Sequence, residues 1–110
     1  MISKALIAAS TKPMILSILS KGENYGYQII QSVKQISGGN MDWTAGMLYP
    51  VLHRMEKEGL IRSRWRLSDE GRRRKYYVIT EAGRKELESD MREWMSVHKA
   101  FSKLWKPVAI

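Results

Sequence analysis

The chain has 110 residues, a hydrophobic fraction of 44% and a net charge of +8 at neutral pH. This length suits one domain with a modest core, and the apolar content excludes a disordered chain. Cysteine is absent and no apolar stretch approaches the ~20 residues that span a bilayer, so we expect no disulfide framework, no thiolate metal site and no membrane association. The composition predicts a cytoplasmic protein whose basic charge favours polyanionic partners.

The N-terminal part of the chain predicts short helices separated by turns. Residues 2–9 suit a short helix or an ordered arm. Thr11 offers a hydroxyl cap for a new helix, in whose first turn Pro13 would fit. Asn24 is expected to cap a second helix over residues 25–37, where apolar side chains recur at helical spacing. A Gly-Gly-Asn segment then ends this helical region.

A third helix is predicted from Met47 to Glu58, with Thr44 as its cap. Residues 41–43 before it are too few for more than a single edge strand. Pro50 either lies in the first turn, which would place the helix start near Gly46, or removes one backbone bond and bends the helix. The inward face of this helix is expected to consist of Leu48, Val51, Leu52 and Met55.

The next segment predicts a β-hairpin. Arginine alternates with less polar residues over positions 62–67, the period of a half-buried strand, and residues 75–80 are rich in β-branched and aromatic side chains. Turn-forming residues 67–71 lie between the two strands. The side chains expected to pack the hairpin onto the helices are Trp65, Tyr76 and Val78.

The charge of this hairpin is its main functional signal. Seven cations lie between Arg62 and Lys75, against only Asp69 and Glu70. Because two acids cannot neutralise seven cations, most of this charge should be free for an external partner. A helix followed at once by a basic hairpin is the layout of a winged helix, which presents cations to nucleic acid phosphates.

The C-terminal segment predicts one long helix. Thr80 caps it, it runs from Glu81 to about Lys106, and Pro107 stops it. Its apolar residues alternate at intervals of four and three, the spacing of a coiled-coil seam; they are Leu87, Met91, Trp94, His98, Phe101 and Trp105. A domain of this size has little core left to cover such a seam, so we expect a homodimer.

The elements together predict a mainly α fold with a small β-hairpin (α+β). We expect a winged helix-turn-helix DNA-binding region over residues 1–79 and a C-terminal dimerisation helix over residues 80–110. The outer face of the third helix would enter the major groove of double-stranded DNA, and the hairpin would contact phosphates or the minor groove. The side chains expected at this interface are Tyr25, Thr44, Gly46, Tyr49, Pro50, His53, Arg54, Lys57, Arg72, Arg73, Arg74 and Lys75.

Two of these assignments have an ordinary structural alternative. The polar face of the third helix could be a solvated surface, although the basic hairpin beside it favours DNA contact. Tyr25, at the start of the second helix, suits a phosphate anchor and core packing equally well.

A second candidate site lies on the long helix. Trp94, with Met91, Met95 and His98 beside it, could line a pocket for a small planar, aromatic or cationic effector. The alternative is that these residues form only the dimer core. No catalytic motif and no metal-binding spacing of histidines is present, so we expect neither an enzyme nor a cofactor.

Three segments resemble the PadR family of bacterial transcriptional regulators. They are residues 24–29 (NYGYQI), residues 47–61 (MLYPVLHRMEKEGLI) and residues 71–83 (GRRRKYYVITEAG). The single C-terminal helix is similar to that of the compact subfamily, which includes repressors of multidrug efflux genes. The sequence departs from the family at Met47, where threonine is usual, and at Trp105, which adds bulk near the helix end.

The resemblance implies a homodimeric repressor that binds a palindromic operator. It also implies that Trp94 stacks on flat drugs in a pore between the subunits, so that an effector could release the DNA. Two readings from other classes remain: a winged-helix protein-interaction adaptor and a nonspecific nucleic-acid binder.

Overall fold

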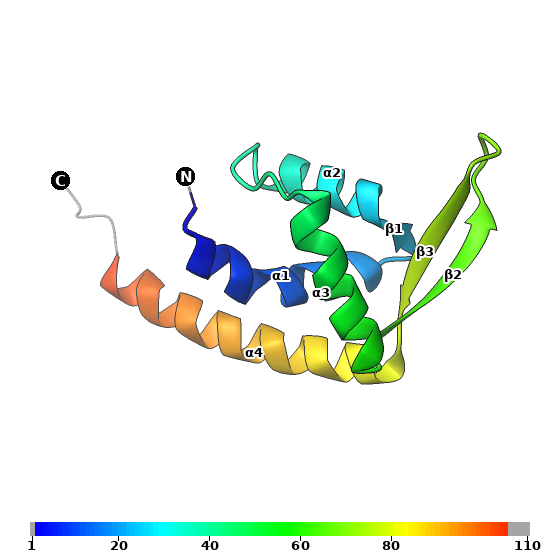
Figure 1. The fold of residues 1–110 in the computed structure, drawn as a ribbon. Coiled ribbons are helices and arrows are strands. Elements are labelled where there is room, and N and C mark those ends of the chain that lie inside the picture. Colours follow the sequence, from blue (N-terminus) through cyan, green and yellow to red (C-terminus); the bar gives the residue numbers. More distant parts are fainter. Residues whose placement is uncertain (1, 106–110) are drawn as a thin grey trace.

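The computed structural model describes residues 2–105, which form helices packed against a small antiparallel sheet (Figure 1). In chain order the elements are α1 (Lys4–Leu19), β1 (Asn24–Tyr25), α2 (Gly26–Ile36), α3 (Ala45–Lys57), β2 (Ile61–Leu67), β3 (Arg73–Ile79) and α4 (Glu81–Leu104). The strand order in the sheet is β1-β3-β2. The expected class, an α+β winged helix-turn-helix with a long C-terminal helix, is confirmed.

The first helix is continuous where the sequence predicted a new start. Ser3 caps α1, since its hydroxyl accepts a hydrogen bond from the Leu6 amide at 3.2 Å. Thr11 is not a cap: it is buried, and its hydroxyl donates to the Ile7 carbonyl one turn earlier at 2.5 Å. Pro13 lies inside the helix, so the expected break was wrong. Proline removes one backbone bond here, and burial of the second half of α1 in the core holds the helix together.

The segment before α2 is a short strand that the sequence pattern did not predict. Asn24 does not cap the helix; it pairs with Tyr77 of β3 as part of β1, and its side-chain oxygen accepts from the Tyr25 amide at 3.0 Å. Tyr25 occupies the cap position of α2 without a side-chain bond. The edge strand considered for residues 41–43 is absent, because Met41 and Trp43 insert into the core instead.

Both ends of α3 are fixed by local signals. The Thr44 cap is confirmed, since its hydroxyl accepts from the Met47 amide at 3.2 Å. The helix begins at Ala45, which leaves Pro50 in its interior. Gly59 ends the helix in the left-handed region (φ 78°), and the Leu60 amide bonds the Met55 carbonyl at 3.0 Å, an arrangement that only glycine adopts readily.

The hairpin, which we call the wing, extends beyond the helices. Its register runs from Ile61↔Ile79 at the base to Leu67↔Arg73 at the tip. Tyr76 is buried, as expected, but Trp65 is 57% exposed, so its expected packing onto the helices was wrong. Trp65 does lie on the same face as buried Ile61, four residues earlier, but the wing has already passed the end of the core at that point.

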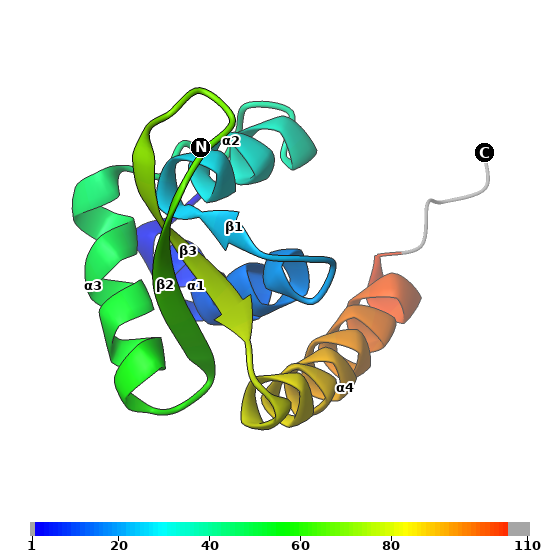
Figure 2. The same ribbon diagram turned by 90° about the vertical axis from the view of Figure 1, so that its right-hand side faces the viewer.

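One apolar core lies between α1, α2, α3 and the base of the wing, and Figure 2 shows α3 running along one side of the sheet. Its buried members are Ile15, Leu16, Leu19, Ile29, Val33, Met41, Trp43, Leu48, Leu52, Met55, Leu60, Ile61, Tyr77 and Leu87. Three of the four residues expected on the inward face of α3 are fully buried, and Val51 packs against the cluster half-buried. This core fixes α3 and the wing relative to each other.

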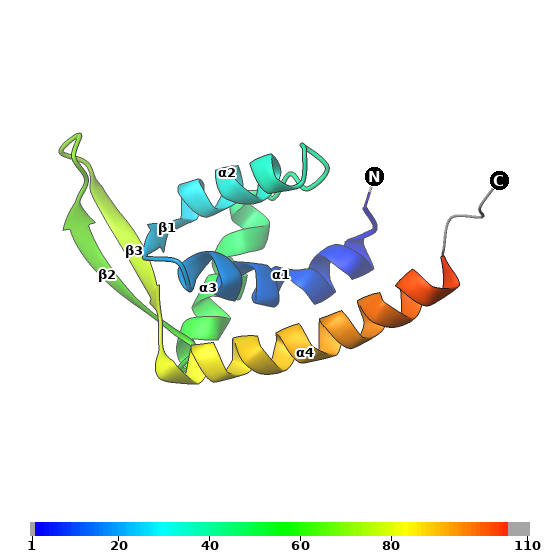
Figure 3. The ribbon, with the colours of Figure 1, turned by 180° about the vertical axis from the view of Figure 1, so that it is seen from behind.

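The last helix is tied to the base of the wing and then runs beside α1 (Figure 3). The Thr80 cap is confirmed: its hydroxyl accepts from the Gly83 amide at 3.0 Å and donates to the Gly59 carbonyl at 2.6 Å. The Thr80 amide also bonds the Leu60 carbonyl at 3.1 Å. The expected end near Lys106 and the stop at Pro107 lie outside the described residues.

Candidate nucleic-acid interface

The outer face of α3 is open along its whole length. Gly46, Pro50, His53 and Lys57 follow one another at helical spacing and are all exposed, opposite the buried face of the helix. The cap residue Thr44 and the flanking Tyr49 and Arg54 are exposed as well. An exposed helix with hydrogen-bond donors along one face, and small or flat residues near its start, has the shape and chemistry of a major-groove reader.

A concave basic surface lies between this helix and the wing. It has a volume of about 690 Å³ and joins the start of α2 to α3 and the wing; its lining residues are Tyr25, Gly26, Tyr27, Tyr49, Trp65, Arg72, Arg73, Arg74, Lys75 and Tyr77. We call this surface the trough. It brings together six of the twelve predicted DNA contacts, and the other six lie along α3. Trp65 and Tyr27, both exposed in the trough, were not among the predicted contacts.

The start of α2 packs directly against α3, the second helix of the helix-turn-helix. A β-carbon on Gly26 would overlap the Tyr49 hydroxyl, so the ring of Tyr49 lies against the first residue of α2.

Nearby, burial raises the pKa of the Tyr77 hydroxyl to about 12, and the neighbouring Tyr49 and Glu56 add to the shift. Tyr77 is therefore neutral at any physiological pH and serves as a core residue.

The cations of the wing divide into paired and unpaired groups. Arg64, Arg66, Arg74 and Lys75 each form an ion pair, whereas Arg62, Arg72 and Arg73 form none among residues 2–105. The expectation that acids within the hairpin leave most of this charge free was incomplete. Glu23 and Glu56, which precede the hairpin in sequence, supply the additional carboxylates.

Aromatic rings hold several of these cations in fixed directions. Arg74 lies over the Tyr25 ring at 4.2 Å and Arg73 over the Trp65 ring at 5.2 Å. Such cation–π contacts restrict an arginine without neutralising it. Tyr25 is half-buried and meets Tyr76 edge-on at 5.4 Å. The packing expected of Tyr25 is thus present, and part of its surface still faces the trough.

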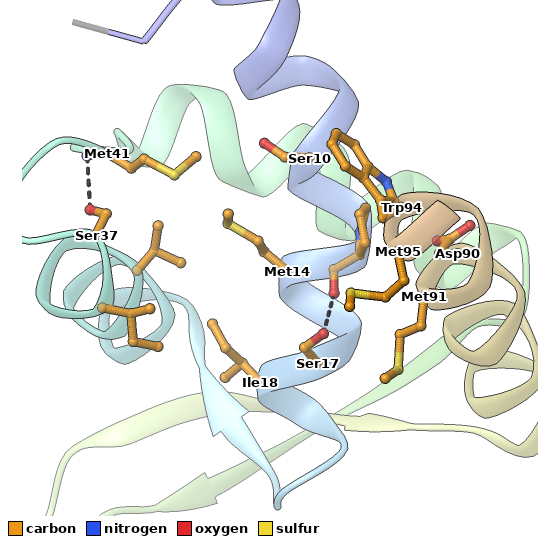
Figure 4. Close-up of a pocket in the computed structure, with 13 residues that line it drawn as sticks. Ser10, Met14, Ser17, Ile18, Ser37, Met41, Asp90, Met91, Trp94 and Met95 are labelled. Carbon is orange, nitrogen blue, oxygen red and sulfur yellow. Dashed lines mark hydrogen bonds between the residues drawn. The ribbon is translucent and has the colours of Figure 1, made fainter. Parts of the chain in front are cut away.

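The second candidate site is a largely apolar cavity between α1, the end of α2 and α4 (Figure 4). Its volume is about 550 Å³. Trp94, Met91 and Met95 line it from α4, and Met14 and Ile18 line it from α1, on the side of that helix nearer α2. His98, which was expected beside them, does not line the cavity and lies 3.4 Å from the Ser102 hydroxyl.

Residues 2–105 offer neither a metal-binding cluster nor a membrane-spanning helix. Within residues 2–105 no cluster of histidine and carboxylate side chains could hold a metal ion. No helix in that range is long and apolar enough to cross a bilayer.

An exposed helix beside a basic trough, on a winged helix-turn-helix core, defines a winged-helix DNA-binding protein. The family model described as "Transcriptional regulator PadR-like family" matches residues 15–89. The chain therefore belongs to the PadR-like family of transcriptional regulators, and it is a DNA-binding regulator rather than an enzyme.

Characterised relatives and solved structures agree with this assignment. The chain is 31% identical over 88 residues to the negative transcriptional regulator PadR of Bacillus subtilis, covering 80% of this chain and 46% of that protein. It is 37% identical over 84 residues to a transcriptional regulator of Mycobacterium tuberculosis, covering 76% and 75% of the two chains. A PadR-like regulator from Bacillus cereus superimposes with a TM-score of 0.84 at 31% identity, covering 94% of this chain and 99% of that one.

Proposed function

We propose that the protein is a homodimeric repressor that binds a palindromic operator through α3 and the wing. The observation that carries this proposal is the open face of α3 beside a trough whose tip holds Arg72 and Arg73 without carboxylate partners among residues 2–105. Negative control is the role named for the Bacillus subtilis relative. A repressor acts by occupying DNA, so the same interface serves both binding and regulation, and we infer a cytoplasmic location.

The exposed seam of α4 supports the dimer. Every residue from Met91 to Trp105 is exposed, including the large apolar side chains Met91, Trp94, Met95, Val97, Phe101, Leu104 and Trp105. A soluble monomer rarely leaves so much apolar surface along one element. The four-three spacing of the seam suits a second copy of the same helix, and a two-fold axis would then place two copies of α3 on one duplex.

In the proposed complex, α3 and the wing would contact different parts of the DNA. Tyr49, His53 and Arg54 would read base edges, with Thr44, Gly46, Pro50 and Lys57 close to the backbone of the major groove. Arg72 to Lys75 and Tyr25 would contact the phosphates that border the trough. Base contacts provide specificity, whereas the arginines provide affinity that depends on salt.

The cavity beside Trp94 suits control by a small planar effector. It borders the proposed dimer seam, since Met91 and Trp94 belong to both, and α4 connects it to the base of the wing through Thr80. A ligand that favours one relative orientation of the two subunits would change the spacing of the two α3 helices and thus weaken operator binding.

Footprinting of the DNA around the protein's own gene tests this proposal. We expect two protected half-sites centred about one helical turn, ~34 Å, apart. Replacing Arg72 and Arg73 with glutamine should weaken protection and make its salt dependence shallower. Uniform, position-independent protection would contradict operator recognition and would favour a nonspecific binder.

A further inference from the structure

Glu23 occupies an unusual position beneath the wing. It lies between α1 and β1, and its two carboxylate oxygens accept from separate arginines of β2: Oε2 from Arg64 at 2.8 Å and Oε1 from Arg66 at 2.7 Å. The Glu23 side chain is only 21% exposed. One internal carboxylate therefore fills the space between two guanidinium groups, where a phosphate would otherwise be attracted.

The sheet holds these three side chains in place. Arg64 and Arg66 are two residues apart in β2, so they share the face of the sheet opposite Ile61 and the core. Glu23 directly precedes β1, which is hydrogen-bonded to β3. Arg66 also lies over the Tyr76 ring at 4.1 Å. This arrangement is built by strand pairing and stacking as well as by charge.

The same two arginines are absent from the trough. Neither Arg64 nor Arg66 lines it, whereas Arg72 to Lys75 all do. Arg74 is the cross-strand partner of Arg66 and shares its face of the sheet, so the two arginines held by Glu23 lie beside the trough without lining it. Arg64 and Arg66, which share the Glu23 carboxylate, thus differ from Arg72 and Arg73, which line the trough and form no ion pair among residues 2–105.

We propose that Glu23 is a specificity-determining residue that keeps Arg64 and Arg66 from binding phosphates of nonspecific DNA. This inference rests on the proposed DNA-binding function. In a loose, nonspecific complex the duplex can approach the wing from several sides, and two additional free arginines would strengthen such encounters. On the operator, α3 fixes the approach, so the same two arginines add little.

The matched pair of variants is Glu23→Gln and Asp69→Asn. Both raise the net charge by one, but Asp69 is exposed at the wing tip and forms no ion pair among residues 2–105. Binding to a random-sequence duplex is measured by fluorescence anisotropy over a series of salt concentrations. Each phosphate contact adds about 0.9 to the slope of log affinity against log salt.

We expect Glu23→Gln to steepen the nonspecific slope by about 1–2 and to raise nonspecific affinity roughly tenfold near 0.1 M salt. Operator affinity should change less, so the ratio of specific to nonspecific affinity falls. Adding Arg64→Gln and Arg66→Gln to the Glu23 variant should restore the wild-type slope. A structural effect of Glu23 alone would not produce this reversal.

Equal slopes for the Glu23 and Asp69 variants would overturn the inference, as would a lower nonspecific affinity for Glu23→Gln. A wild-type protein that binds no duplex at low salt would instead overturn the proposed function itself. The two failures are therefore distinguishable in one experiment.

Discussion

The substitution Gly83→Ala tests how closely the start of α4 packs against the base of the wing. Gly83 lies in the first turn of α4, where a β-carbon would overlap the carbonyl oxygen of Leu60 and lie 2.8 Å from Cγ1 of Ile79. The Leu60 carbonyl cannot easily move, because it accepts the hydrogen bond from the Thr80 amide. Gly83→Ala must therefore separate α4 from the end of α3 or distort the strand that leads into it.

The expected magnitude follows from two opposing effects. Overpacking of this kind costs about 1–3 kcal/mol, and alanine in a helix returns roughly 0.5–1 kcal/mol relative to glycine. The net loss is about 1–2 kcal/mol. In a domain of this size each kcal/mol changes the melting temperature by about 4–8 °C, so we expect a decrease of roughly 5–15 °C in thermal denaturation followed by circular dichroism.

Gly46→Ala is the matched control. Gly46 is also helical, but a β-carbon there would meet only the Thr44 hydroxyl, at 3.9 Å. Alanine should raise stability by about 0.5–1 kcal/mol, while its extra methyl group weakens DNA binding if Gly46 approaches the duplex. A melting temperature that rises in both variants would refute the close contact between α4 and Leu60.

Three other predictions concern the core, the cavity and the seam. The folded-state pKa of Tyr77 is about 12, whereas its ordinary value is 10.0. The free energy of unfolding that depends on its proton is therefore complete below pH 10 and falls by up to about 3 kcal/mol as the pH rises to 12. Tyr77→Phe should flatten this fall in urea titrations, and an unchanged fall would contradict the raised pKa. Trp94→Ala should abolish binding of planar aromatic cations by calorimetry, while Trp105→Ala, outside the cavity, should retain it. Phe101→Glu should produce monomers by analytical ultracentrifugation and weaken operator binding at least tenfold; a dimer of unchanged affinity would exclude the proposed seam.

Local signals in the sequence were sufficient for most of the fold. The hydroxyl caps at Thr44 and Thr80 and the left-handed Gly59 each act within four residues, so they could be recognised without knowledge of the tertiary structure. The alternation of arginine with less polar residues likewise indicated the first strand of the wing. The helical spacing of Leu48, Val51, Leu52 and Met55 marked the inward face of α3 and so its exposed face.

The errors arose where distant parts of the chain decide the outcome. β1 is only two residues long and exists because β3 lies beside it, so no local pattern indicates it. Alternation correctly assigned Trp65 to one face of the wing but gave no information on where the core ends. Pro13 looked like a helix start, whereas core packing carries α1 through it.

The sequence predicted which residues form the candidate site better than it predicted how their charges are paired. The sequence located the cations of the wing but not the carboxylate of Glu23, which is 41 positions from its partner Arg64. The sign of a charge can be read from the sequence, but its pairing requires the fold. The ion pairs with Glu23 distinguish Arg64 and Arg66 from Arg72 and Arg73, which line the trough and form no ion pair among residues 2–105.

The geometry of the operator complex tests the central proposal most directly. Native mass spectrometry on the footprinted duplex should give two protein chains per duplex. Inserting about five base pairs, half a helical turn, between the half-sites should then abolish joint binding, because the two α3 helices could no longer face the same side of the DNA. A single bound chain, or binding indifferent to the insertion, would contradict the account.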